Sequence, residues 1–257
     1  NSFLVTTPVF LRSDSKFQTK LIGDRWHEDE IKAARSLSIS LPTEEDKYEG
    51  LESLISSINK MPNLNSLLSP ADLINCFSKE ILKRLEYLSI ASPSKQIVFD
   101  TILNSKEFFL PDQTLQSLKS FDFFLPIKYI KNFSKNTMPN LTWCGLELEA
   151  LDRAGTSFKK FEEFDNFFGF EVRSIKNEDL LDKIKKDISA LYLWSITARQ
   201  FKFEKLEEFK SLKYIWLNGF SGNFDFKDLS LLKNLEEITI TSFSGFKNIE
   251  VLSDLRN

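Results

Sequence analysis

The feature that most constrains this chain is an apolar spacing that returns along most of its length. From Phe209 to Leu217, apolar residues stand three, three and then two positions apart, and Leu232 to Ile240 repeats the same spacing. Self-similarity of this period is the signature of a protein built from stacked repeats. The third apolar position of successive copies falls at Leu37, Leu67, Leu88, Phe121, Cys144, Phe170, Leu191, Ile215 and Ile238.

The end of each copy alternates apolar with other residues, which predicts a short strand whose every second side chain points inward. Strands of one parallel sheet are expected at residues 37–39, 88–90, 121–123, 144–146, 170–172, 191–193, 215–217 and 238–240. The copy at Leu67 is expected to fail, because the polar Ser69 occupies its last apolar position. Helical spacing predicts helix-like segments between the copies, at residues 51–58, 71–85, 150–168 and 179–188.

The template L-x-x-L-x-x-L-x-L resembles the core of the leucine-rich repeat family, and about nine copies of it cover Ile31 to Ile240. The family's repeat continues to a buried asparagine, at a position that here holds Pro93, Pro126, Glu149, Ile175, Ile196, Phe220 and Phe243. The resemblance is therefore to a divergent, bacterial-type repeat that lacks the asparagine ladder. It implies an α/β fold: a right-handed solenoid with a parallel sheet on its concave side and helical or irregular segments on its convex side.

The resemblance also sets the expected organisation of the chain. Residues 1–30 are assigned to an N-terminal capping segment and residues 31–257 to the repeat domain. Leu252 and Leu255 begin a further copy that runs past the last residue, whereas a terminal repeat normally carries a polar cap. We therefore expect the sequence to be cut from a longer protein.

Composition argues against several classes of function. The formal net charge is −3, without the basic stripe that nucleic-acid binding requires. The sequence has no apolar run long enough to span a membrane, no Gly-rich phosphate loop and no His-rich metal set, so we expect neither cofactor nor metal. Cys76 and Cys144 are expected to be reduced core residues, which favours a cytoplasmic location for a chain without a recognisable secretory signal.

Strand alternation also predicts which side chains point outward, onto the concave face. Three of the four Trp and three of the five Tyr fall there. Tyr192 is expected beside Trp216, and Arg173 between Glu147 and Trp194, because neighbouring strands lie about 4.8 Å apart. The candidate partner-binding residues are Tyr87, Asp122, Phe124, Trp143, Glu147, Glu171, Arg173, Tyr192, Trp194, Tyr214, Trp216 and Asn218.

Exposed Trp, Tyr and Arg are the residues that anchor protein interfaces, so we interpret this face as a non-catalytic recognition surface for a partner protein. A toxin-neutralising immunity protein is one form of such a binder. Two alternatives stay open. The aromatic side chains could only cover the sheet or pack beneath a loop, or they could bind or cleave carbohydrate together with Asp122, Glu147 and Glu171. Catalysis by the single histidine, His27, is not expected, because no nucleophile stands in register with it.

Overall fold

The structure is a computed structural model that describes residues 18–21, 28–40, 51–91, 115–123, 133–147, 159–173, 181–182, 184, 186–194, 203–219, 221–242 and 244–254. The chain divides into two compact units, Asn1–Leu141 and Thr142–Asn257. Each unit is an α/β array of parallel strands with short helices in the connecting segments. The coarse expectation of a repeat-like α/β chain with a parallel sheet is therefore confirmed.

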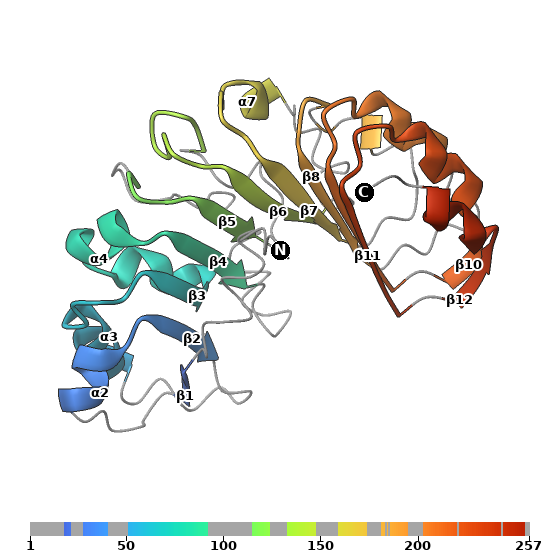
Figure 1. The fold of residues 1–257 in the computed structure, drawn as a ribbon. Helices are drawn as coiled ribbons and strands as arrows, with labels where there is room; N and C mark the ends of the chain where they lie inside the picture. Colours follow the sequence, from blue (N-terminus) through green and yellow to red (C-terminus); the bar gives the residue numbers. More distant parts are fainter. Residues whose placement is uncertain are drawn as a thin grey trace. The chain divides into compact units, whose positions relative to one another are not determined.

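The strands of the first unit follow one another in sequence order: β1 (Gln18–Leu21), β2 (Ser36–Ser40), β3 (Ser66–Pro70), β4 (Tyr87–Ala91) and β5 (Ser120–Phe123). Every neighbouring pair is parallel. The connecting segments contain α2 (Glu28–Ala33), α3 (Leu51–Asn59), η1 (Ala71–Cys76) and α4 (Lys79–Arg84). Figure 1 shows α2, α3 and α4 on the same side of the strands. The segment assigned to an N-terminal cap thus contributes a strand, β1, to this sheet.

The second unit repeats the plan with β6 (Trp143–Glu147), β7 (Gly169–Arg173), β8 (Ala190–Trp194), β9 (Tyr214–Asn218) and β11 (Glu237–Thr241), again all parallel. Its connecting segments contain α7 (Lys159–Glu162), η4 (Phe203–Glu208), η5 (Phe226–Leu231) and η6 (Ile249–Asp254). A second parallel pair, β10 (Ser221–Asp225) and β12 (Ser244–Lys247), lies apart from β11, near the red helical turns in Figure 1.

Inward side chains stack in register and form the core. Leu88 lies opposite Phe121, and Leu191 lies opposite Ile215; the exposed fraction of all four side chains is 0%. Ile238 continues the stack beside Ile215 but is only half-buried, because β11 pairs with a single neighbour among the described strands. The inward direction predicted for these residues is therefore correct.

Phenylalanine fills much of the core of the second unit. The rings of Phe161, Phe164, Phe167 and Phe170 form one buried cluster, with centroids 4.5 to 6.5 Å apart. Aromatic pairs in this range attract one another beyond the gain from burying their area. Phe side chains thus occupy positions that the repeat template assigns to leucine.

Consecutive repeats are joined by a recurring backbone contact just before each strand. The carbonyl oxygen of Ser189 accepts hydrogen bonds from the N–H groups of Lys213 and Tyr214, at 2.9 and 3.0 Å. The oxygen of Lys213 accepts the equivalent pair from Glu236 and Glu237, at 2.8 and 3.0 Å. The same two-donor arrangement occurs at Arg35, Asn65, Glu86, Thr142 and Phe168. Each repeat therefore satisfies two N–H groups of the next one, which fixes the strand register.

The copy at Leu67 contradicts our expectation, because Ser66–Pro70 does form a strand. β3 pairs with β2 on one side and β4 on the other, and Leu67 and Ser69 are both fully buried. Hydrogen bonds from two neighbouring strands hold this backbone in place despite the polar residue in an apolar position. Ladder bonding on both edges outweighs one unfavourable side chain.

The predicted helices are correct in part. The helix at residues 51–58 is present as α3, but residues 71–85 form η1 and α4. The interruption is Ser78, whose Oγ accepts a hydrogen bond from Ile81 N and whose N–H donates to Asn59 Oδ1. A serine in this role begins a helix and does not continue one.

The two later helix predictions are confirmed only over short pieces of the described chain. Of residues 150–168, Lys159–Glu162 are helical, and residues 150–158 lie outside the described ranges. Of residues 179–188, residues 181–182 form a short 3₁₀ turn, and the other described residues, 184 and 186–188, are not helical. Apolar residues three positions apart lie here in tight turns, which need fewer backbone hydrogen bonds than a helix.

The two cysteines differ in environment. Cys144 is buried in the core as predicted, whereas Cys76 is exposed at the end of η1. The prediction placed Cys76 within a helix-like stretch over residues 71–85, whereas the structure ends η1 at this residue.

Candidate recognition face

Four aromatic side chains form a continuous cluster on the outward face of β8 and β9, which we call the aromatic patch. Tyr192 and Trp194 lie along β8, with ring centroids 6.0 Å and ring planes 18° apart. Tyr214 and Trp216 lie along β9, with corresponding values of 6.4 Å and 23°. The two rows meet where Tyr192 and Trp216 are register partners, with centroids 6.4 Å apart and planes at 68°. The predicted neighbourhood of Tyr192 and Trp216 is therefore confirmed.

The aromatic patch presents ring surface to solvent. Trp194 is 36% exposed, and Tyr192, Tyr214 and Trp216 are half-buried. The inward residues that alternate with them, Leu193 and Leu217 among them, are fully buried. Strand alternation thus separates a packed core from an accessible aromatic surface.

Polar groups hold the aromatic patch at two of its edges. Asn218 Nδ2 donates a hydrogen bond to Tyr192 Oη at 3.1 Å. Tyr214 Oη donates to Glu236 Oε2 at 3.0 Å, and Lys213 Nζ donates to Glu236 Oε1 at 2.7 Å. The two phenol rings are therefore held in fixed orientations by partners on neighbouring strands and turns.

These contacts also set the charges at the edge of the patch. Hydrogen bonds from Lys213 and then Tyr214 lower the pKa of Glu236 below its ordinary value. The hydrogen bond to Glu236 and its charge raise the pKa of Lys213. Burial, followed by the hydrogen bond to Glu236, raises the pKa of Tyr214. At neutral pH the edge thus holds a carboxylate, an ammonium group and a neutral phenol.

Four of the predicted face residues are buried, contrary to the expectation that they lie on an accessible surface. The exposed fractions are 3% for Tyr87, 2% for Asp122, 1% for Trp143 and 1% for Glu171. Tyr87 Oη donates a 2.6 Å hydrogen bond to Asp122 Oδ2. Strand alternation gives the direction of a side chain, but burial depends on what packs over it, and at these positions the chain covers its own sheet.

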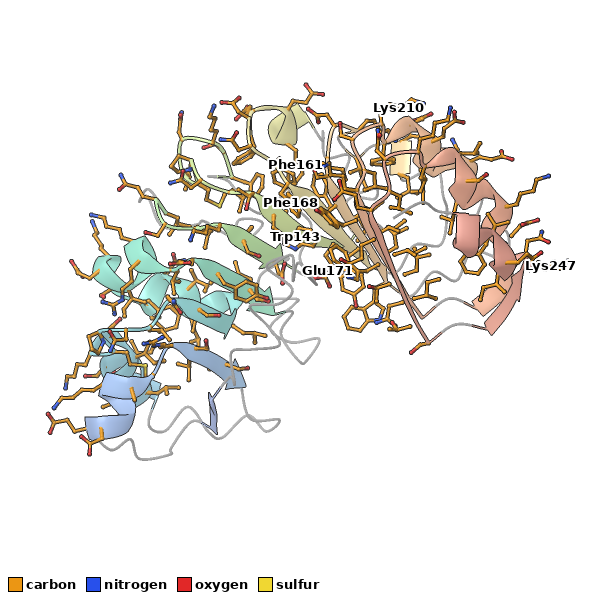
Figure 2. The ribbon with its side chains drawn as sticks, viewed as in Figure 1. Trp143, Phe161, Phe168, Glu171, Lys210 and Lys247 are labelled. Atoms are coloured by element: carbon orange, nitrogen blue, oxygen red, sulfur yellow. The ribbon has the colours of Figure 1, made fainter. Side chains whose placement is uncertain are left out.

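Gly169 makes room for one of these buried residues, Trp143. A Cβ atom at position 169 would lie 2.8 Å from Cζ3 of Trp143 and nearer still to the carbonyl oxygen of Ala190. Figure 2 labels Trp143, Glu171 and Phe168 in this region of the second unit. The ring centroids of Phe168 and Tyr214 are 6.1 Å apart. In the backbone register, Ala190 lies between Gly169, the residue after Phe168, and Tyr214.

The remaining predicted site residues are only partly described. The backbone register places Arg173 between Glu147 and Trp194, as predicted, but the side chains of Arg173 and Glu147 lie outside the description. Phe124 is also outside the described residues, as is His27. Five of the twelve candidates have described side chains that lie together on the accessible face. They are Tyr192, Trp194, Tyr214, Trp216 and Asn218.

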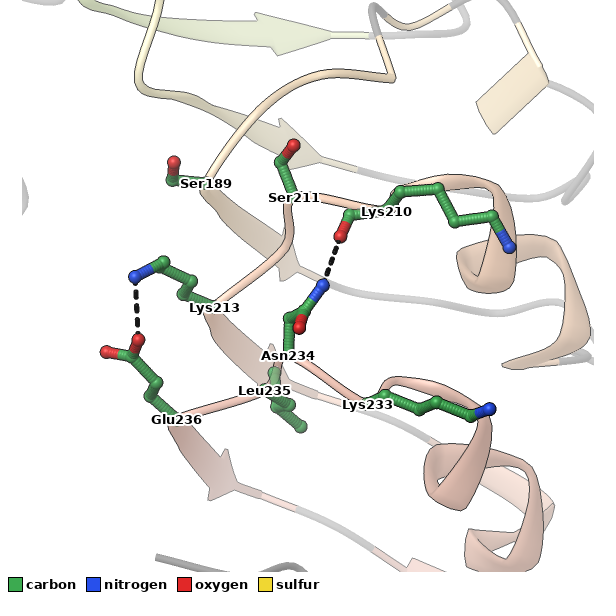
Figure 3. A pocket seen from close by; sticks show the side chains of 8 residues that line it. All are labelled: Ser189, Lys210, Ser211, Lys213, Lys233, Asn234, Leu235 and Glu236. Atoms are coloured by element: carbon green, nitrogen blue, oxygen red, sulfur yellow. Dashed lines mark hydrogen bonds and ion pairs between the residues drawn. The ribbon is translucent and has the colours of Figure 1, made fainter.

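A polar cleft of about 620 Å³ lies beside the patch, at the turns that precede β8, β9 and β11. Figure 3 shows Lys213 directed at Glu236 and Asn234 directed at the main-chain oxygen of Lys210, while the side chains of Lys210 and Lys233 extend in another direction. The cationic groups do not converge on one point, so the cleft has no site for a single anion. Glu236 connects the cleft with the patch, because it lines the cleft and accepts a hydrogen bond from Tyr214.

Sequence reasoning missed Phe168, Lys213 and Glu236 as neighbours of the patch. All three occupy the same repeat position, two residues before the third apolar residue of a copy. A column drawn through that position reads Arg35, Asn65, Glu86, Lys119, Thr142, Phe168, Ser189, Lys213 and Glu236, and would have shown the opposite charges of Lys213 and Glu236 on consecutive copies.

Among the residues that the structure describes, no group of three or more His, Cys, Asp or Glu side chains is placed to hold a metal ion. No helix there combines the length and apolar character required to cross a membrane.

Comparison of the sequence with models of known protein families and with curated proteins finds no match.

Proposed function

We propose that this chain is a divergent leucine-rich repeat protein that binds a partner protein through the aromatic patch and catalyses no reaction. The observation that carries the proposal is the unbroken contact of Tyr192, Trp194, Tyr214 and Trp216 on a partly accessible sheet face. Such rings supply large contact area at a small cost in conformational entropy. Trp and Tyr are also the residues whose truncation most often weakens protein interfaces.

A cytoplasmic location and a toxin as the partner are expectations within this proposal. Free cysteines such as Cys76 and Cys144 are typical of proteins from reducing compartments. Affinity capture from the source organism is the experiment that identifies the partner.

The second candidate is carbohydrate binding, which the near-parallel rings along each strand favour. The ring pairs stack with their planes 18° and 23° apart and are partly exposed, and accessible aromatic rings of this kind can pack against sugar rings. Carbohydrate cleavage has less support, because Asp122 and Glu171 are almost fully buried and a glycosidase needs a pair of carboxylates that reaches its substrate.

The test is affinity capture with the wild-type chain and with Tyr192→Ala, Trp194→Ala and Trp216→Ala. Ile249→Ala is the matched control, because Ile249 is a large apolar side chain, 46% exposed, on η6 and away from the patch. We expect the three patch variants to lose a protein that the wild type and the control retain. Retention of every captured protein by all three variants would refute the proposal, and loss of an oligosaccharide in its place would favour the second candidate.

A further inference from the structure

The aromatic patch is bordered by carboxylates on both flanking strands. The register places Glu171 of β7 beside Tyr192 and Glu237 of β11 beside Tyr214. Glu237 is exposed and forms no ion pair with any residue in the described part of the chain. Its neighbour Glu236 is also exposed, but Lys213 and Tyr214 occupy its carboxylate.

The charge on this face is therefore uneven. Lys213 balances Glu236, whereas Glu237 has no ion-pair partner among the residues that the structure describes. Glu237 stands in register with Tyr214, so the rings of Tyr214 and Trp216 on β9 lie beside the strand that carries this negative charge.

We propose that the partner presents an arginine-bearing basic segment that packs on Tyr214 and Trp216 and pairs with Glu237. This inference rests on the proposed function. The face of an aromatic ring carries negative charge and attracts a cation within about 6 Å of its centroid. A guanidinium group stacks on aromatic rings and also pairs with carboxylates through two parallel hydrogen bonds. The combination of two ring faces and one available carboxylate fits that group better than a neutral or an acidic side chain.

A neutral partner segment would meet this surface at a disadvantage. Contact over β9 and β11 removes water from Glu237, and an ionised carboxylate that loses its water needs a partner of opposite charge. An acidic segment would add repulsion from Glu237 to that loss. Charge complementarity therefore selects the class of partner, while the rings supply most of the contact area.

The test uses the whole chain labelled with ¹⁵N at tryptophan, whose four indole N–H signals report on single sites. The probe is the peptide amide Gly-Arg-Gly-Arg-Gly, and its control is the same peptide with citrulline, which keeps the shape but lacks the charge. We expect the arginine peptide to shift the signals of Trp194 and Trp216, with Trp216 shifted more. The signal of the buried Trp143 should not move. The citrulline peptide should bind at least about fivefold more weakly.

Glu237→Gln should weaken the arginine peptide by about threefold and reduce the effect of added salt on binding, since surface pairs are worth little and are screened. Glu204→Gln on η4 is the control for loss of one exposed carboxylate elsewhere, and should leave binding unchanged. Equal binding of both peptides, or no shift at about 10 mM peptide, would overturn the inference.

The outcomes also separate this inference from the proposed function. A captured protein that is lost with Trp216→Ala but binds Glu237→Gln with the same affinity and the same salt dependence as the wild type would leave the proposed function standing and refute the basic segment. An oligosaccharide that shifts Trp194 and Trp216 while neither peptide does so would refute both in favour of carbohydrate binding.

Discussion

Asn234 donates a side-chain hydrogen bond to the main-chain oxygen of Lys210, 2.7 Å away and one repeat earlier in the chain. Asn140 makes the same contact with Gln116, and Asn63 makes it with Lys32. Each asparagine directly precedes the second apolar residue of its copy. Side-chain amides therefore join repeats at the turn before the strand, a position that differs from the one expected from the family resemblance.

Replacing Asn234 by alanine should destabilise the second unit by about 0.5–1.5 kcal/mol, the net contribution of one intramolecular hydrogen bond. Asn234→Asp should also destabilise, because it keeps the size of the side chain but removes the donor. The measurement is the free energy of unfolding from urea denaturation. Lys233→Ala at the adjacent exposed position is the control and should change it by less than about 0.5 kcal/mol.

Gly169→Ala should destabilise the chain by about 1–3 kcal/mol, because the added methyl group meets both the carbonyl of Ala190 and the ring of Trp143. The nearer contact is with backbone, so the additional change Trp143→Leu should not restore stability. The reverse change at the equivalent strand position, Ala190→Gly, should cost only about 0.5–1 kcal/mol. Equal costs for the two single variants would contradict the close approach seen at Gly169.

Leu217→Ala and Trp216→Ala are adjacent changes with different expected results. Leu217 is fully buried, so its truncation should leave a cavity and cost about 2–5 kcal/mol. Trp216 is half-buried and contacts two rings, so its truncation should cost about 1–2 kcal/mol and should also weaken partner binding. Denaturation and affinity capture on the same samples compare the two effects. A larger stability loss for Trp216→Ala would mean that the register is wrong.

Tyr87→Phe removes the hydroxyl that donates to the buried carboxylate of Asp122. We expect a loss of about 1–3 kcal/mol, the cost of taking one partner from a buried polar group. The variant should retain the captured partner fully, because Tyr87 is 3% exposed and cannot be reached. A folded Tyr87→Phe variant that no longer captures the partner would show that this part of the face does take part in binding.

The Glu236 contacts predict a pH dependence of stability. The folded-state pKa of Glu236 is lowered, so its stabilisation is present above the unfolded-state pKa of about 4.3 and is lost as the pH falls through the folded value. The pKa of Lys213 is raised, so its share is present below about 10.4 and is lost as the pH rises through the folded value. The difference in thermal midpoint between wild type and Glu236→Gln should be present at neutral pH and vanish in acid. A difference that persists unchanged at pH about 2 would contradict this linkage.

The sequence carries enough information for the inward and outward directions of the strands. Leu191 opposite Ile215 and Tyr192 opposite Trp216 follow from a period of two combined with the recurring template. The strand at Ser66 was missed because the template was applied to one copy alone. Its neighbours on both sides supply the hydrogen bonds that its own side chains do not predict.

Accessibility is the part of the candidate site that local pattern could not supply. Trp143 and Trp216 both point outward from their strands, yet one is 1% exposed and the other half-buried. The difference depends on what packs over each ring, and no period along the chain records it. The hydrogen bond from Tyr87 to Asp122 was missed for the same reason, because it joins two outward positions on neighbouring strands.

The carbonyl oxygen that accepts two hydrogen bonds before each strand has a consequence for how such a chain evolves. The segment between Leu88 and Phe121 is much longer than that between Leu67 and Leu88, yet both pairs lie opposite each other in the same parallel register. Among the described residues, backbone connections between neighbouring copies recur at the strand and at the residues just before it. Inserted residues in the connecting segments therefore leave the pairing intact, and a duplicated or deleted copy brings together two surfaces that already fit. The length of a connecting segment can vary under selection while the sheet that carries the aromatic side chains stays in register.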